Sequence, residues 1–567
     1  MFRRLSTLAF AVATAAALAA GVHALQTPSL ENLKTTAEAS GFTSTSSYDD
    51  VVRFMKAVDA ASPLVHYTTY GKTFEGRDMP LAVVGTGLKD ASPASVRASG
   101  RLRVHIQGNI HAGEVEGKEA AQILLREFAQ GRHADWLKSM VFIITPIYNA
   151  DGNERMSPTN RTTQHGPING MGTRAQAQNI NLNRDYMKLD TSEGKASAKL
   201  WVDYDPHVGY DLHTSNGSCH AYYLTYSPPL NPNTSAAIMS IMKDEWFPYA
   251  TKQVKAKHGW DMFYYGNTQN REGECPGGGR GRGARGGDPG AAATPTPTPP
   301  PQPTPAPPRS WRTFEHVPRF HNNYVGLRNR FALLSEAYSY ATFEDRIKVT
   351  NYFMEETLNW AQQNVDKIKR AVATADRESI VGKMLATRAE IKVEGMVEIL
   401  MGAVDQEPSP VSGRMMNRRR NVVKPEQMMN GLWFRATSEE DVPAEYYVPA
   451  AATKALDLLR AHGIQLRQVT QAVKGVEVFT LASNTQRPPT NNIDTGAHGL
   501  RTLTGGWAPA ADTTVPAGSW AVPMNQPLAR LAFYLLAPTS DDGLTNWNFL
   551  DDMLGEGTKA YPILRRR

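Results

Sequence analysis

The sequence predicts a three-layer α/β/α sandwich with a mixed central sheet, followed by a C-terminal accessory domain that is β-rich or α+β. Apolar runs of strand length alternate with helical patterns up to about residue 365, which is typical of a sheet covered by helices on both faces. From about residue 377, short alternating segments separated by Pro and Gly turns indicate strands. The chain has 567 residues, and this length favours about two or three domains over one core.

The N-terminus has the order of a secretory signal peptide. Arg3 and Arg4 precede an alanine-rich apolar run over residues 8–20, and residues 22–24 offer a small-x-small cleavage site. We therefore predict a signal peptide over residues 1–24 and a secreted or periplasmic protein, with an uncleaved anchor as the alternative. No segment reaches the ~20 apolar residues of a membrane helix, so no stable membrane insertion is expected.

Composition and charge favour a globular protein that does not bind nucleic acid. The net charge of +6 is modest for this length, and the basic residues form short clusters without interleaved aromatic side chains. Such clusters are more typical of a solvated surface than of a nucleic-acid site. Cys219 and Cys275 are the two cysteines of the chain. They allow at most one disulfide, which an exported location would permit, and they could equally stay free.

Residues 273–308 differ in composition from the rest of the chain, because Gly-Arg repeats are followed by alternating Thr-Pro and Pro-Pro pairs. A segment with almost no apolar surface cannot offset its ordering entropy, so we predict disorder or polyproline structure. The segments on its two sides are both expected to contribute to one site. We therefore interpret it as a surface insertion within the first domain rather than as a linker.

The first candidate for chemistry lies where a predicted strand over residues 102–107 ends and a helix begins at Val115. His111 and Glu114 occupy the connecting turn, the place where open α/β sheets build their sites. An imidazole nitrogen and a carboxylate three positions apart can face one zinc ion at ~2.0–2.2 Å, with a third ligand from elsewhere in the chain. The motif alone is weak, and the alternative is an acid that complements the helix dipole beside a solvated histidine.

Further segments of the same kind follow in order. A buried-strand run ends in the turn at residues 149–152, and a polar stretch covers residues 179–185. A short strand over residues 210–214 presents a histidine, and a buried strand over residues 330–336 carries one carboxylate near its end. An amphipathic helix over residues 346–367 would close the first domain.

These segments resemble, in order and context, the zinc carboxypeptidase family, the relatives of the pancreatic A and B enzymes. The resemblance covers roughly residues 48–365 and implies the same α/β/α sandwich. It also implies one zinc ion per chain, with His111, Glu114 and His213 as its ligands. Zinc in such a site polarises the scissile carbonyl and lowers the pKa of its bound water toward ~7.

The same resemblance assigns substrate-binding and catalytic roles. Asn183 and Arg184 match the pair that binds the terminal carboxylate of the substrate, which a planar guanidinium can hold in a bidentate manner. Glu336 matches the general base that takes a proton from the water and returns it to the leaving amine. Arg161 and Arg174 are the two candidates for the cation that stabilises the oxyanion, and Arg161 is nearer to the expected spacing.

Two positions depart from the family pattern. The family commonly carries an aspartate that orients a zinc histidine, and this chain has Asn181 there. Metal affinity would then be lower, or another acid such as Asp211 would serve. Tyr324 is the best match to the tyrosine that caps the substrate and is included as a substrate-binding candidate, although a packing role is favoured for it.

The sequence therefore predicts a zinc-dependent metallocarboxypeptidase that hydrolyses the C-terminal bonds of peptides or proteins. A zinc amide deacylase or a cell-wall peptide hydrolase of the same fold is one alternative, and a catalytically inactive binding module is another. The predicted domains are the signal peptide at 1–24, the catalytic domain at 48–367 with the insertion at 273–308, and an accessory domain of unknown role at 377–567.

Overall fold

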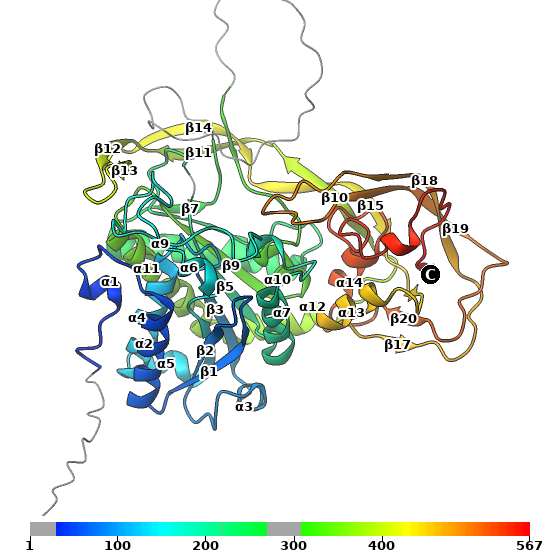
Figure 1. Cartoon of the computed structure of the whole chain (residues 1–567), viewed down its shortest axis with the longest axis horizontal. Helices are drawn as coiled ribbons and strands as arrows, with labels where there is room; N and C mark the ends of the chain where they lie inside the picture. Colours follow the sequence, from blue (N-terminus) through cyan, green and yellow to red (C-terminus); the bar gives the residue numbers. More distant parts are fainter. Residues whose placement is uncertain (1–29, 216, 269–307) are drawn as a thin grey trace, which may run out of the picture.

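The computed structural model describes residues 30–215, 217–268 and 308–567 (Figure 1). The predicted signal peptide, nearly all of the predicted insertion and Cys275 lie outside these residues. Cys219 is fully buried and is not a free cysteine. Among the described residues, no helix has both the length and the apolar character needed to cross a membrane.

The first part of the chain forms a mixed sheet whose four central strands are parallel. The next strand on each side pairs antiparallel with these four, and of the two outermost strands one pairs antiparallel and the other parallel with its inner neighbour. Central parallel strands are covered on both faces, so their sequences are continuously apolar, and β4 and β5 are buried along their whole lengths. In spatial order the strands are β1 (Val65–Lys72), β2 (Asp78–Val84), β4 (Met140–Thr145), β3 (Leu102–Gly108), β5 (Val208–Thr214), β9 (Phe331–Ala337), β6 (Leu224–Ser227) and β7 (Met262–Tyr264).

Helices cover both faces of this sheet, as predicted. Alternate residues of β4 point to opposite faces, because Phe142 and Ile144 belong to one core and Val141 and Ile143 to the other. The first core is covered by α2 (Tyr48–Ala61), α4 (Glu116–Ala129), α5 (Ala134–Ser139), α9 (Phe247–His258), α11 (Phe343–Gln363) and α12 (Val365–Arg377). The second is covered by α3 (Pro93–Ala98), α7 (Ser192–Tyr204) and α10 (His321–Leu327). Shorter elements are α1 (Thr36–Ala39), α6 (Ala150–Asn153), η1 (Leu182–Arg184), α8 (Ala236–Ser240) and η2 (Ile241–Trp246).

The C-terminal region is α+β, which was one of the two predicted forms. A six-stranded sheet contains β17 (Arg467–Gln468), β20 (Trp520–Pro523), β16 (Glu445–Val448), β21 (Leu564–Arg566), β18 (Glu477–Gln486) and β19 (Arg501–Pro509). Smaller sheets pair β10 (Met384–Lys392) with β15 (Trp433–Asp441), and β12 (Val404–Pro408) with β13 (Met415–Arg419). A third joins β11 (Met396–Met401), β14 (Lys424–Gly431) and β8 (Ser310–Arg312), and the helical elements are α13 (Thr453–Ala461), α14 (Ala529–Leu536) and η3 (Asp551–Met553).

The C-terminal region is packed against the second face of the catalytic sheet. Its helices α13 and α14 belong to the same continuous hydrophobic core as α7 and α10. In Figure 1 they lie beside α12 and α10, and β8 of the first region pairs in parallel with β14 of the C-terminal region. The layer on this face is therefore completed by residues far apart in the sequence.

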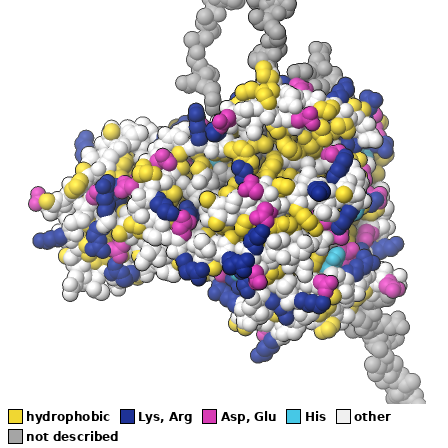
Figure 2. All heavy atoms as spheres, turned by 180° about the vertical axis from the view of Figure 1, so that it is seen from behind, with side chains coloured by type: hydrophobic (Ala, Val, Ile, Leu, Met, Phe, Trp, Pro, Cys, Tyr) yellow, Lys and Arg dark blue, Asp and Glu magenta, His cyan; other side chains and the backbone are white. Residues whose placement is uncertain are grey.

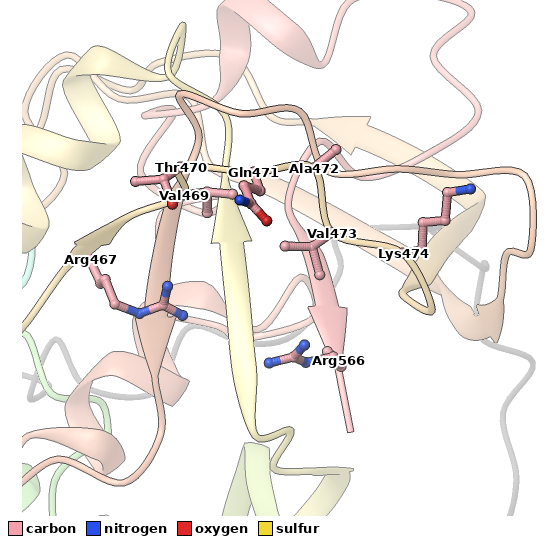
Figure 3. Close-up of a pocket in the computed structure, with 8 residues that line it drawn as sticks. All are labelled: Arg467, Val469, Thr470, Gln471, Ala472, Val473, Lys474 and Arg566. Atoms are coloured by element: carbon pink, nitrogen blue, oxygen red, sulfur yellow. The ribbon is translucent and has the colours of Figure 1, made fainter.

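The outer surface carries mixed charge on the face shown in Figure 2. Lys and Arg side chains are interspersed there with Asp and Glu, and apolar side chains gather between them. A separate hollow of about 400 Å³ lies in the C-terminal region between residues 467–474 and Arg566 (Figure 3). Its two arginines, Arg467 and Arg566, both pair with Glu445. None of the predicted site residues lines this hollow.

Candidate metal centre and active site

The turn between β3 and α4 places two of the predicted ligands. A Cβ atom at Gly108 would lie only 2.9 Å from the carbonyl oxygen of Pro146, so a close backbone approach requires glycine at the end of the strand. The next residue, Asn109, has a left-handed backbone with φ of 64°. Its side-chain amide donates to the carbonyls of Ala112 and Glu114. The turn is thereby fixed by its own hydrogen bonds.

The other two predicted residues lie at the ends of neighbouring parallel strands. His213 on β5 is directly opposite Glu336 on β9. Because parallel strands end at one edge of a sheet, both residues meet the β3–α4 turn at the same edge. The sheet topology thus gathers four residues from three distant segments.

The three predicted ligands form one buried cluster. His111 Nδ1 lies 3.0 Å from Glu114 Oε1, and His213 Nδ1 lies 2.8 Å from Glu114 Oε2. Their ligand atoms all lie within 4.8 Å of one another. Tetrahedral zinc ligands at ~2.0–2.2 Å from the ion are about 3.3–3.6 Å apart. The two contacts to Glu114 are shorter than this by about 0.3–0.8 Å, so a zinc ion would widen them, and the donor set of two imidazoles and one carboxylate is one that zinc prefers.

Outer hydrogen bonds orient both histidines. His111 Nε2 lies 3.0 Å from Asn181 Oδ1, and His213 Nε2 lies 2.8 Å from Asp211 Oδ2. Each imidazole therefore uses Nε2 for an outer partner and presents Nδ1 to the cluster, the arrangement typical of metal-binding histidines. The outer partner of His213 is therefore the carboxylate of Asp211, and that of His111 is the amide of Asn181.

Burial and neighbouring charges act differently on the three ligands. Burial and the Arg174 charge lower the pKa of His111 to about 3. Burial disfavours charge on His213, but Asp211 and Glu114 outweigh it and raise its pKa well above the usual value. Burial is likewise outweighed at Glu114, where His111 and Arg161 hold the pKa well below its usual range. Glu114 is thus ionised and His111 is neutral, the forms in which these groups bind metal.

Both candidate arginines reach the cluster. Arg161 Nη2 donates to Glu114 Oε1 at 2.6 Å. Arg174 Nη1 lies 3.7 Å from the same oxygen and 3.3 Å from His111 Nδ1. Burial raises the pKa of Glu336, and the charge of Arg174 partly opposes this rise. Each guanidinium is therefore placed where it can stabilise negative charge that develops near the ligands.

Asn183 of the predicted carboxylate-binding pair lies at the cluster, and the Arg184 guanidinium contacts Asn183. Asn183 Nδ2 lies 3.4 Å from His213 Nε2, and its Oδ1 accepts from the backbone N–H of His321. The Arg184 guanidinium stacks 3.6 Å from the centre of the Phe320 ring and donates through Nη1 to the Asn183 carbonyl. Burial lowers the pKa of Arg184 to about 10, so the side chain stays charged at neutral pH.

The pKa of Glu336 is shifted in the direction that suits a general base which later returns its proton. Burial raises its pKa well above the usual value and Glu114 adds to this, whereas His213 opposes it. A second nearby group is Tyr265, which the sequence did not indicate. Burial and the charge of Glu336 raise the pKa of its phenol. Its position before the insertion, far from Glu336 in sequence, concealed this proximity.

Tyr324 is not brought to the metal cluster. Its side chain is fully buried in the second core, and its hydroxyl bonds to His462 Nδ1 at 3.0 Å and to Arg328 Nη1 at 3.1 Å. These contacts join α10 to the C-terminal region. The structure therefore places Tyr324 in a packing position instead of the substrate-binding position given as its other candidate role.

The chain is thus an α/β protein in which two histidines and one glutamate that fit zinc are buried at the edge of the sheet. Residues 51–355 match the family model described as zinc carboxypeptidase. This match covers more than half of the chain, which therefore belongs to the zinc carboxypeptidase family. The resemblance seen in the sequence is confirmed.

Individual relatives are more distant. Carboxypeptidase 2 of Trichophyton rubrum is 28% identical over 165 residues, which are 28% of this chain and 27% of that protein. Probable carboxypeptidase 2 of Trichophyton verrucosum is 29% identical over 146 residues, 25% of this chain and 24% of that protein. The chain thus matches about a quarter of the length of these relatives.

Solved structures of similar proteins include two named as carboxypeptidase A. The putative enzyme of Shewanella denitrificans has a TM-score of 0.36 at 19% identity, covering 56% of this chain and 69% of that one. The enzyme of Helicoverpa armigera has a TM-score of 0.37 at 14% identity, covering 59% of this chain and 76% of that one.

Proposed function

We propose that this chain is a zinc-dependent metallocarboxypeptidase that removes residues from the C-termini of peptides or proteins. The observation that carries the proposal is the placement of Asn183 beside the buried cluster of His111, Glu114 and His213, with the Arg184 guanidinium bonded to the Asn183 carbonyl. A carboxylate-binding pair next to a metal centre selects a free terminus and sets the cleaved bond at the metal. Family membership supports the same activity.

Substrate binding rests on the guanidinium of Arg184. The ring of Phe320 and the carbonyl of Asn183 hold it in one orientation. Its Nε lies 3.9 Å from Asp494 Oδ1, and the planar guanidinium can bind a terminal carboxylate in a bidentate manner, which a lysine could not do. Asn183 Nδ2 adds a donor on the side of His213.

The chemical step follows from the remaining residues. Zinc held by His111, Glu114 and His213 would supply a Lewis acid and an activated water. Glu336 would accept a proton from the attacking water and return it to the leaving amine, and its raised pKa suits both directions of transfer. The guanidinium of Arg161 or Arg174 stabilises the negative charge that develops on the carbonyl oxygen.

The test measures zinc content and hydrolysis of blocked dipeptides by the purified parent and by His213→Ala. We expect about one zinc per chain and turnover in the parent, with both lost in the variant. A free and an amidated C-terminus are compared in each substrate pair, because Arg184 recognises only the free carboxylate.

Other outcomes would favour the alternatives. Zinc with hydrolysis of acylated amino acids but not of blocked dipeptides would indicate an amide deacylase, and activity on cell-wall peptides alone would indicate that hydrolase. Absence of zinc after metal supplementation would indicate an inactive binding module.

We also propose that the protein is exported, on the basis of the charged and apolar order of residues 1–24. N-terminal sequencing of protein recovered outside the cytoplasm should begin after Ala24. A mature chain that retains Met1 would contradict the cleavage.

A further inference from the structure

The loop between β18 and β19, residues 487–500, connects the C-terminal region with the catalytic site. The backbone N–H of Asn181 donates to the carbonyl of Ile493 at 2.7 Å. The side-chain Nδ2 of Asn181 donates to Asp494 Oδ1 at 2.8 Å. A third contact joins His498 Nε2 to Asp190 at 3.0 Å. The loop is thus held at Asn181, which contacts the predicted metal ligand His111, and at Asp190.

Asp494 and Asn181 continue the hydrogen-bond chain that starts at His111. Although burial opposes it, Arg184 and the Asn181 amide lower the pKa of Asp494, so its carboxylate is ionised at neutral pH and can only accept hydrogen bonds. Asp494 therefore faces the NH₂ group of the Asn181 amide, which leaves the amide oxygen facing His111 Nε2 at 3.0 Å. The backbone N–H of Asn183 donates to the same oxygen at 3.1 Å and agrees with this orientation.

The orientation of the amide determines which nitrogen of His111 carries the proton. An amide oxygen accepts, so Nε2 must be the protonated nitrogen, and the lone pair then lies on Nδ1. Nδ1 is the atom that faces Glu114 at 3.0 Å within the metal cluster. A reversed amide would turn its NH₂ group toward Nε2 and favour the tautomer whose Nδ1 cannot bind metal.

Asp494 also contributes a negative charge to the surroundings of His111. An aspartate at position 181, which the family resemblance leads one to expect, would supply a negative charge beside the histidine, and an amide does not. Asp494 brings that charge one side chain further out, and its Oδ1 also lies 3.9 Å from Nε of Arg184. One carboxylate therefore acts on both the metal ligand and the carboxylate-binding arginine.

We propose that Asp494 is a positioning residue of the metal centre, which acts through the Asn181 amide to fix the metal-binding form of His111. The C-terminal region would then complete the catalytic site and not only accompany it. The inference rests on the proposed zinc site, and it deepens that proposal by giving the C-terminal region a role in it.

Zinc affinity tests this inference independently of turnover. The dissociation constant is measured by competition with a chelator for the parent, Asp494→Ala and the control Asp512→Ala. Asp512 is an exposed acid that follows β19. Outer partners of metal-binding histidines typically contribute 10–100-fold to metal affinity. We expect Asp494→Ala to weaken zinc binding by about 10-fold or more and the control to match the parent.

A rescue variant tests whether Asp494 acts on His111 through the Asn181 amide or only holds the loop of residues 487–500 in place. Asn181→Asp combined with Asp494→Ala places a carboxylate directly against His111, so that Asp494 is no longer needed to orient an amide there. We expect this double variant to recover most of the lost affinity. If Asp494→Ala does not fold, Asp494→Asn keeps the side-chain size and one acceptor oxygen, and it should weaken binding by a smaller factor.

The outcomes distinguish the two proposals. A parent without zinc affinity would overturn the proposed function and this inference with it. A parent that binds zinc together with an Asp494→Ala variant of equal affinity would overturn the inference alone. Weaker binding that the double variant does not restore would show that Asp494 only holds the loop in place, and it would likewise overturn the inference.

Discussion

Tyr324→Phe separates a packing role for this tyrosine from a role in substrate binding. The phenol hydroxyl lies between His462 Nδ1 and Arg328 Nη1. His462 Nε2 bonds to the carbonyl of Met187 and must donate to it, so Nδ1 carries the lone pair that accepts from the tyrosine. The hydroxyl in turn accepts from Arg328. Its removal therefore deletes two buried hydrogen bonds and leaves the ring in place.

The expected loss of stability follows from what remains unpaired. Arg328 Nη1 keeps a second acceptor, the carbonyl of His462 at 2.9 Å. His462 Nδ1 has no such alternative contact among the described residues, and a buried unpaired acceptor costs about 1–3 kcal/mol. An unfolding entropy of ~2.1 cal/mol/K per residue makes each kcal/mol worth roughly 1 °C in Tm for a chain of this size. We expect Tm to fall by about 1–3 °C.

The assay combines calorimetry with kinetics on blocked dipeptides. For Tyr324→Phe, KM and kcat should equal those of the parent, because the side chain has no contact with the metal cluster. Tyr265→Phe is the matched comparison, since the same atom is deleted from a phenol whose pKa is raised by burial and by the charge of Glu336, and there we expect kcat/KM to fall. An unchanged Tm together with a several-fold rise in KM for Tyr324→Phe would refute the packing role.

Three further predictions concern the base, the carboxylate-binding residue and acid stability. Glu336→Gln should lower kcat about 10²–10⁴-fold at unchanged zinc content; equal turnover would exclude it as the base. Arg184→Ala should raise KM about 10–100-fold for substrates with a free C-terminus, as expected for lost charged hydrogen bonds, and should not affect amidated ones; an equal effect on both would contradict carboxylate recognition. Although burial opposes it, His498 and Lys188 lower the pKa of Asp190 to about 2, so its stabilisation is complete above pH ~4 and is lost as pH falls toward 2. The Tm difference between the parent and Asp190→Asn should shrink over this interval, and a constant difference would rule out the linkage.

The catalytic site could be predicted from sequence wherever its residues follow strong local patterns. His111 and Glu114 lie in a turn that a continuous apolar strand and an amphipathic helix enclose, and the structure confirms β3 and α4 there. Glu336 is near the end of another apolar run, confirmed as β9. Parallel strands end at a common edge of the sheet, so a residue predicted at the end of such a strand is also predicted to lie near the other site residues.

The remaining residues depend on contacts that no local pattern encodes. Tyr265 precedes residues 269–307 in the sequence, and only the tertiary fold brings it near Glu336. Asp494 is in a turn-rich stretch of the C-terminal region, 313 positions from the residue that it contacts. A polar loop of this kind has neither the periodicity of a helix nor that of a strand, so its partner could not be inferred.

Asn181 shows how such a contact changes the meaning of a residue. In the sequence it is a departure that removes charge from beside a metal-binding histidine. In the structure its amide has an acceptor-only carboxylate on one side and His111 on the other. Because an amide has one donating and one accepting end, Asp494 selects the orientation that serves the histidine. If this coupling holds, substitution of either residue alone should affect metal binding by a similar factor, and substitution of both to alanine should cost no more than one, since residues that act as one unit are non-additive.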